Sequence, residues 1–178
     1  NDLQSRMVNE FPELQGIAGR HYATASGEPS EIALAIDESY QPRFAGDDIA
    51  LSPVGKVLAI AERLDTLVGG FAAGLKPTGN KDPFALRRNA LGIARTIIES
   101  GFDLNVRILS LLALKEVLVA LHKPSVSQLK AISELAESGF TFGRENFPEN
   151  PGINLIKEQL ISISSETYDF TLDRLRGY

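Results

Sequence analysis

Hydrophobic residues recur along most of this 178-residue chain at the three- and four-residue spacing of amphipathic helices. The alternating pattern that is typical of strands is almost absent, so the sequence predicts an all-α fold. The predicted helices cover residues 2–11, 13–23, 31–40, 53–68, 83–99, 104–122, 126–137 and 154–176. The glycine-, proline- and asparagine-rich stretch 139–152 is expected to be a long surface loop.

Small polar residues and prolines mark three helix starts. Ser30, Ser52 and Asp82 can each accept a hydrogen bond from a free N–H group of a first helical turn. Pro53 and Pro83 suit the first helical position, because its N–H group has no partner within the helix. Glycines are expected to loosen or end the helices that they follow: Gly69, Gly70, Gly74 and Gly101.

The buried faces follow from the spacing of apolar residues. Helix 31–40 should use Ile32, Ile36 and Tyr40, and helix 53–68 should use Val54, Val57, Leu58, Ala61, Leu64 and Val68. Helix 83–99 carries two apolar stripes, so neighbours are expected on both sides: Phe84, Leu91 and Ile98, and Leu86, Ala90, Ile93 and Ile97. Helix 104–122 is apolar nearly all round and is the predicted central helix. Gly16 and Gly19 favour close backbone packing.

Composition narrows the possible functions. The formal charge is −5, with 43% hydrophobic and 23% charged residues, which suits a globular protein and requires any RNA-binding surface to be local. Cysteine is absent, which excludes disulfides, thiolate metal sites and a cysteine nucleophile. The apolar run 108–121 contains Ser110, Lys115 and Glu116 and is too short for a membrane span. The chain begins with Asn1 and is expected to be an internal piece of a longer protein.

Asp65 is the most conspicuous candidate for a buried charge. It falls between Ala61 and Val68, at the edge of the expected apolar face of helix 53–68. A buried carboxylate needs a hydrogen bond, a counter-ion or a metal. Arg88 and Arg95 are the expected partners, and a structural ion pair or hydrogen-bond network is favoured over a metal site.

Other catalytic signals are weak. His21 and His122 are too isolated to form a paired metal site. His21 is expected to be a partly exposed polar residue of a packed helix in preference to a catalytic base, and His122 is given no catalytic role. The glycines near Lys76 and Thr78 do not have the spacing of a phosphate-binding P-loop, and no dinucleotide-binding fingerprint is present. The sequence therefore predicts no catalytic residue, no metal and no cofactor for this chain.

The candidates for RNA contact lie mainly in and beside the breaker-rich segment 76–88. They are Lys76, Lys81, Arg87 and Arg88, together with Arg43 from an earlier loop, and Arg63 lies nearby in the sequence. Arginine can hold a phosphate through two parallel hydrogen bonds, whereas lysine acts as a mobile charge. The alternative is a solvated loop with structural arginines. Arg174 and Arg176 form a second basic pair that could meet RNA or a following domain.

Three segments in order carry a resemblance to a known family: Pro42-Arg43-Phe44-Ala45-Gly46-Asp47, Ala61 to Gly69, and Lys76 to Arg88. Together they resemble the β subunit of bacterial heterotetrameric glycyl-tRNA synthetase. The similarity is best over residues 10–98 and weakens after Gly101. Residues 170–176 again look like the helix that leads toward that family's anticodon-binding domain, which is missing here.

The resemblance implies a single HD-like helical domain over residues 1–178, with Asp2 and Asp65 as remnants of a dismantled metal site. It also implies a cytoplasmic enzyme in which the α subunit uses ATP and magnesium to form glycyl-adenylate. The implied partners are that α subunit, the tRNA for glycine and the remaining β-subunit domains, with no membrane. The hypothesis is a non-catalytic module that positions tRNA or braces other domains. The alternatives are an HD-type metal-dependent phosphohydrolase and a purely structural interdomain module.

Overall fold

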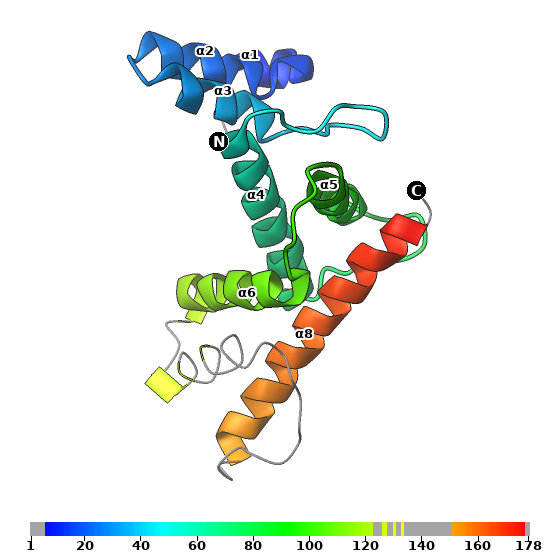
Figure 1. Ribbon diagram of the computed structural model, residues 1–178. Coiled ribbons are helices and arrows are strands. Elements are labelled where there is room, and N and C mark those ends of the chain that lie inside the picture. The colour runs from blue at the N-terminus through cyan, green and yellow to red at the C-terminus, as the bar shows by residue number, and fades with distance from the viewer. Residues whose placement is uncertain (1–5, 123–125, 128–129, 131–132, 134–150, 177–178) are drawn as a thin grey trace. The chain divides into compact units, whose positions relative to one another are not determined.

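The computed structural model describes residues 6–122, 126–127, 130, 133 and 151–176 (Figure 1). Within these residues the chain is helical and contains no strand, which confirms the all-α prediction. The elements are α1 (Arg6–Glu10), the 3-10 helix η1 (Pro12–Leu14), α2 (Ile17–Ala25), α3 (Ser30–Glu38), α4 (Pro53–Ala72), α5 (Leu86–Glu99), α6 (Val106–His122) and α8 (Pro151–Arg176).

The chain divides into two compact units. Unit 1 comprises Asn1–Arg63 and Leu91–Phe102, and unit 2 comprises Leu64–Ala90 and Asp103–Tyr178. The long helices α4 and α5 each contribute one part to each unit. The HD-like arrangement and the single domain expected from the sequence stay predictions.

Close packing of α2 on α3 organises the start of unit 1. A Cβ atom at Gly16 would lie 2.9 Å from Tyr40 Cδ2, and one at Gly19 would lie 2.8 Å from Ile36 Cγ2. The two glycines therefore allow the close approach that the sequence predicted. The prediction for the buried face of α3 is partly right, because Ile36 and Tyr40 are half-buried against Gly19 and Gly16. Ile32 is instead exposed, and the fully buried apolar residues are the small Ala33 and Ala35.

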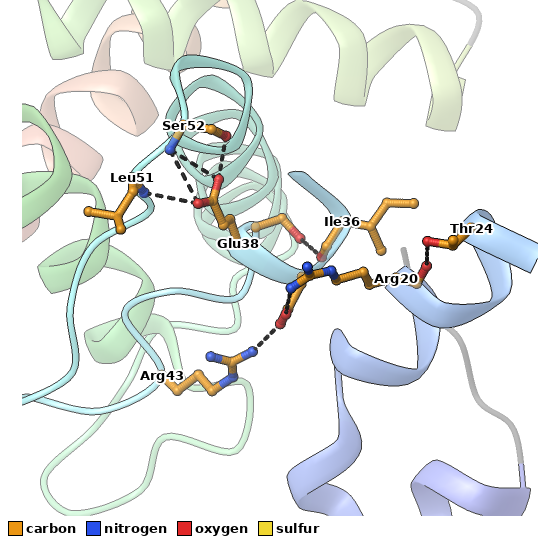
Figure 2. Close-up of polar contacts among 9 residues, drawn as sticks. Arg20, Thr24, Ile36, Glu38, Arg43, Leu51 and Ser52 are labelled. Carbon is orange, nitrogen blue, oxygen red and sulfur yellow. Dashed lines mark hydrogen bonds and ion pairs between the residues drawn. The ribbon is translucent and has the colours of Figure 1, made fainter. Parts of the chain in front are cut away.

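A buried carboxylate fixes the start of α4. Glu38, at the end of α3, accepts hydrogen bonds from the backbone N–H groups of Leu51 and Ser52 and from the Ser52 hydroxyl (Figure 2). Ser52 Oγ in turn accepts from the Gly55 N–H at 3.0 Å, so the predicted start at Ser52 and Pro53 is confirmed. Ser30 does not cap α3: it lies inside the helix, and Pro29 occupies the cap position without a side-chain bond.

The buried face of α4 is turned away from the predicted one. Leu64 and Val68 are buried as expected, but Val57, Ala61 and Asp65 are exposed. These three lie four residues apart and form one solvent-facing ridge. The buried positions are Gly55, Ala59, Ile60, Arg63, Leu64, Leu67, Val68 and Phe71. The helix also continues through Gly69 and Gly70, which were expected to loosen or end it, and stops at Ala72.

Unit 2 is built around the packing of α6 and α8. Val68, Leu111 and Leu114 form a buried cluster, against which Ala72, Ala113 and Ile163 pack. Helix α6 thus contributes buried residues to unit 2, but it is not buried all round, because Leu112 and Val119 are exposed, and its central position in the fold stays a prediction. The buried positions of α8 include three hydroxyl residues: Ser164, Thr167 and Thr171. Thr167 and Thr171 donate to carbonyl groups four residues earlier, and Ser164 donates to the Arg107 carbonyl at 3.1 Å.

Only one of the two predicted stripes of α5 is buried. Leu86, Ala90, Ile93 and Ile97 are buried, whereas Phe84 and Ile98 are 50% and 60% exposed. The helix begins at Leu86 rather than at Pro83. Ala85 has a positive φ of 53°, which interrupts helical geometry immediately before the first turn.

Some predictions fall on residues outside the described ranges. Of the helix predicted at 126–137, only Val126, Ser127, Lys130 and Ser133 are described, and these four are helical. Most of the loop predicted at 139–152 is also outside, but Pro151 and Gly152 belong to α8, which corrects that end of the loop. Among the described residues, no helix has the length and apolar character needed to cross a membrane.

The contact between Glu38 and Gly55 predicts opposite effects for two alanine substitutions in α4. A Cβ at Gly55 would lie 2.8 Å from Glu38 Cβ and 2.9 Å from Ser52 Oγ, and would also meet the Glu38 carboxylate. We expect Gly55→Ala to reduce the free energy of unfolding by about 1–3 kcal/mol through overpacking. The matched control is Gly69→Ala, whose Cβ would make an ordinary 4.0 Å contact with Val117.

Gly69→Ala should be neutral or stabilising by up to about 1 kcal/mol, because alanine loses less backbone freedom than glycine in a helix. Urea-induced unfolding followed by circular dichroism measures both changes. Equal stabilities for the two variants would show that the carboxylate does not restrict Gly55.

Candidate functional site

The segment between α4 and α5 in unit 2 contains a short, closed turn. Thr78 N–H donates to the Lys81 carbonyl at 3.1 Å, and Lys81 N–H donates to the Thr78 carbonyl at 2.8 Å. Gly79 adopts a φ of +51° within this turn, a conformation that glycine tolerates without steric cost. The backbone of residues 78–81 is therefore held in one shape by its own hydrogen bonds.

Arg87 reaches back from α5 to this turn. Its Nη2 donates to the Gly79 carbonyl at 2.7 Å, and its Nη1 approaches the Lys81 carbonyl at 3.5 Å. Asp82 holds the first turn of α5 from the other side, because its carboxylate oxygens accept from the Leu86 and Arg87 N–H groups at 2.8 and 2.9 Å. The predicted cap is therefore confirmed, although the helix starts later than expected. The guanidinium of Arg87 braces the loop.

Lys81 and Arg88 differ from Arg87 in their surroundings. Both side chains are exposed, and within the described residues neither forms an ion pair or a side-chain hydrogen bond. Their positive charges are not neutralised by a neighbouring carboxylate there. A fixed turn that presents Lys81, followed by a helix start that presents Arg88, is suited to contact an anionic backbone, because neither segment loses much backbone freedom on binding.

Lys76, at the start of the same segment, is already paired. Its ammonium group forms an ion pair with Glu166 of α8, and Ser162 also donates to Glu166. The hydrogen bond from Lys76 is the main cause that lowers the pKa of Glu166, with a smaller contribution from Ser162 and an opposing effect of burial. Lys76 also lies 5.8 Å from the ring centre of Phe71. The pairing ties this loop to α8.

Aromatic contacts next to this ion pair join α4 to α8. Phe71 meets Phe170 edge-on with ring centres 5.3 Å apart, and the guanidinium of Arg174 lies 5.3 Å from the Phe170 ring centre. Arg176 pairs with Asp173 at 3.2 Å on the exposed side of the helix. Of the second basic pair predicted from the sequence, Arg174 therefore contacts an aromatic ring and Arg176 forms an ion pair.

Arg43 belongs to unit 1 and is also neutralised. Its Nη2 lies 2.6 Å from Asp37 Oδ1, and Arg20 approaches the other oxygen of the same carboxylate at 3.7 Å (Figure 2). The backbone N–H of Arg43 donates to Asp47 at 2.6 Å. Of the five residues predicted to contact RNA, Arg43 and Lys76 are paired, Arg87 braces a loop, and Lys81 and Arg88 are free among the described residues.

The expectation for Asp65 is wrong, because its side chain is exposed and a neighbouring arginine carries the buried charge. Arg63 is only 6% exposed and donates to the carbonyl groups of Ser39, Tyr40, Pro42 and Ala59 at 2.9–3.3 Å. Burial lowers the pKa of Arg63 to about 10, against a smaller raising effect of Glu62. Arg95, proposed as a partner for Asp65, instead contacts Glu99 at 2.7 Å and the Ala45 carbonyl at 2.9 Å.

The predicted remnants of a metal site gain no support from the geometry. Asp2 lies outside the described residues, and Asp65 is exposed on the ridge of α4. Among the described residues, no three histidine, cysteine, aspartate or glutamate side chains gather closely enough to hold a metal ion. His21 is exposed on α2, in agreement with its assignment as a polar surface residue.

Sequence reasoning missed three of the polar residues that hold the structure together. Glu38 caps α4, Arg63 binds the loop after α3, and Arg107 stacks on Tyr168 with its guanidinium carbon 4.3 Å from the ring centre. Each contact joins residues at least 13 positions apart in the chain. The one signal in the sequence was the helical position of Arg63, which lies beside the apolar face of α4. The roles of Glu38 and Arg107 depend on tertiary contacts.

The ion pair between Lys76 and Glu166 predicts a measurable change in titration. In Lys76→Met, the pKa of Glu166 should rise toward its ordinary value of 4.5, because the variant removes the largest cause of the lowered pKa. A carboxylate with a lowered pKa stabilises the fold above its unfolded pKa, and this stabilisation is lost as the pH falls through its folded pKa. The pair is more than a third exposed, so its contribution should be below about 1 kcal/mol at pH 7.

Carbon-detected NMR titration of the Glu166 carboxyl group measures the change, with Lys115→Met as a control that removes a lysine outside this pair. An unchanged Glu166 titration in Lys76→Met would show that the ion pair is not formed in solution.

Comparison with known proteins places the whole chain in one family. Residues 1–178 match the family described as Glycyl-tRNA synthetase beta subunit. The glycine–tRNA ligase beta subunit of Xanthomonas campestris pv. campestris (strain B100) is 62% identical over 180 residues, covering 100% of this chain and 21% of that protein. Its namesake in Xylella fastidiosa (strain Temecula1 / ATCC 700964) is 53% identical over 178 residues, covering 100% of this chain and 24% of that protein.

A shorter match joins residues of this chain to the beta subunit of Pseudomonas savastanoi pv. phaseolicola (strain 1448A / Race 6), with 58% identity over 105 residues and 59% of this chain covered. The chain thus spans less than a quarter of the length of the two relatives that it matches throughout. A family match over the complete chain, with more than half of the residues identical in those two relatives, leads to one conclusion: this chain belongs to the glycyl-tRNA synthetase beta-subunit family.

Proposed function

We propose that this part of the beta subunit helps to bind and position tRNA during ATP-dependent glycylation, with Lys81 and Arg88 as its phosphate contacts. The observation that carries the proposal is a pair of exposed, unneutralised cations: Lys81 on the turn that Arg87 holds in shape, and Arg88 on the first turn of α5 next to Arg87. The family membership supplies the RNA partner, because the matched relatives are named as tRNA ligase subunits.

The proposal assigns no catalytic residue and no cofactor to this chain. Glycyl-adenylate formation from glycine and ATP, with magnesium, belongs in this proposal to the α subunit in the cytoplasm, and the tRNA for glycine is the shared substrate. The net charge of −5 is compatible with this role, since phosphate binding needs only a local basic surface. Arg87 positions the 78–81 turn, and Lys76 joins the same segment to α8 through Glu166. Arg43 forms an ion pair with Asp37 inside unit 1.

The alternative of a purely structural interdomain module draws support from the same ion pairs. Lys76 and Arg43 already have carboxylate partners, so neither charge is available to RNA without breaking an internal contact. The experiment below separates the two functions. The phosphohydrolase alternative rests on the HD-like resemblance alone, and the described residues add no ligand cluster to it.

The test is the salt dependence of tRNA binding by full-length β purified with α. The variant Lys81→Ala/Arg88→Ala should weaken binding and reduce the slope of log affinity against log salt by about 2, which is roughly one unit per phosphate contact. The control is Arg6→Ala/Arg20→Ala, which removes two exposed cations from unit 1, of which Arg20 lies 3.7 Å from Asp37, and should leave that slope unchanged. Filter binding over a range of salt concentrations gives both slopes.

Circular dichroism and the α–β assembly state check that each variant is folded. A folded Lys81→Ala/Arg88→Ala variant with the wild-type slope would reject the phosphate contacts and favour the structural module. A reduced slope in both double variants would indicate that total charge, rather than this loop, determines the salt dependence.

A further inference from the structure

The loop that follows α3 in unit 1 is held by an unusual number of polar contacts for a short surface segment. Its carbonyl groups at Pro42 and Ala45 accept from Arg63 at 3.3 Å and from Arg95 at 2.9 Å. Both arginines are only 6% exposed. Burying a guanidinium group carries a large desolvation cost, which these hydrogen bonds to the loop help to offset. The loop is therefore built into the interior of unit 1 at two points.

Two further hydrogen bonds close the loop on itself. Arg43 N–H donates to the Asp47 carboxylate at 2.6 Å, and Asp47 N–H donates to the Phe44 carbonyl at 3.1 Å. The guanidinium of Arg43 is fixed on Asp37. Loops usually gain conformational freedom from their exposure, but here the backbone bonds and the Arg43 side chain restrict that freedom.

Phe44 is the residue that this arrangement exposes. Its side chain is 64% accessible although the backbone on either side of it is fixed. A phenylalanine held in water contributes nothing to folding, whereas a rigid aromatic side chain is the typical anchor of an interface, because the ordering cost of binding is already met. The feature is thus more suited to binding than to stability.

The charges around Phe44 indicate the chemistry of its partner. Asp37 neutralises Arg43, so the remaining charges of the loop are the carboxylates of Asp47 and Asp48, and Asp48 is exposed. Carboxylates in the same short loop oppose the approach of a phosphate backbone. They favour a protein surface with an apolar pocket and basic side chains at its rim.

We propose that Phe44 anchors unit 1 in an apolar pocket with a basic rim, elsewhere in the same β polypeptide. More than three quarters of the length of the fully matched relatives lies outside this chain. A surface on that remainder is covalently tethered, so it reaches an effective concentration that a separate partner does not. The proposal depends on the family placement and not on the tRNA contacts of Lys81 and Arg88.

The decisive experiment places a photoreactive benzoylphenylalanine at position 44 of full-length β, purified with α and supplied with tRNA. Irradiation should cross-link position 44 to β residues outside this chain, at sites that mass spectrometry identifies. The control carries the same group at Val57, which is equally 64% exposed but lies on α4. Cross-links from position 44 mainly to α, mainly to tRNA, or no stronger than those from Val57 would each overturn the proposal.

Substitutions in full-length β test the chemistry of the contact. Phe44→Ala should speed hydrogen exchange at the cross-linked pocket by about tenfold or more, as expected when an interface anchor is truncated. Phe44→Leu keeps most of the apolar volume and should stay within about threefold of wild type. Because the side chain is mostly exposed within this chain, neither change removes core packing, and circular dichroism checks the fold.

A Phe44→Leu variant as impaired as Phe44→Ala, with weakened tRNA binding in both, would identify the ring as a stacking surface for a nucleobase and would overturn the protein contact. Unchanged exchange in Phe44→Ala would show that the pocket does not depend on this side chain and would also overturn it.

Discussion

A single buried guanidinium group determines how the first half of the chain can fold. Arg63 of α4 enters the interior of unit 1 with no carboxylate among its hydrogen-bond partners, and donates instead to backbone carbonyl groups at the end of α3 and beyond it. The carboxyl end of a helix carries partial negative charge, so this position suits a cation. Gly92 of α5 leaves the space, since a Cβ there would lie 2.8 Å from Arg63 Cδ. The Arg63 side chain of α4 thus contacts the end of α3 and packs against α5 at Gly92.

Some of the basic side chains form contacts within the protein, and others are exposed and available to a partner. Arg63, Arg95 and Arg87 donate to carbonyl groups of loops. These hydrogen bonds help to fix the shape of the loops, although no pattern in the loop sequences indicates them. Arg43 and Lys76 are held by carboxylates. Only after these contacts are assigned do Lys81 and Arg88 stand out, among the five residues predicted to contact RNA, as cations without a partner in the described part of the chain. A count of basic residues would have treated all of them alike.

The extent to which the sequence predicted the structure depends on the range of each interaction. Helical spacing and local capping correctly gave the all-α class and the roles of Ser52 and Asp82, because both are decided by residues within one or two turns. The helix bounds were less exact, since α2 begins at Ile17 and α5 at Leu86. The choice between Asp65 and Arg63 as the buried charge was wrong. They are two positions apart on α4, and only the neighbouring helices determine which one faces the interior. The functions of the adjacent Arg87 and Arg88 likewise differ through a contact with Gly79, which no periodicity reveals.

The hydroxyl groups buried on α8 give its packing an unusual character. Thr167 and Thr171 direct their hydroxyls to carbonyl groups of their own helix, so each presents mainly its methyl group to neighbouring elements. Among the side chains described on this helix, the Ser164 bond to Arg107 is the hydrogen bond that reaches α6. Shape rather than directional bonding therefore governs much of this contact. Among the described side chains, Ser164 and Tyr168 of α8 both contact Arg107, so a small sliding movement of α8 along α6 would disturb two contacts of this one residue.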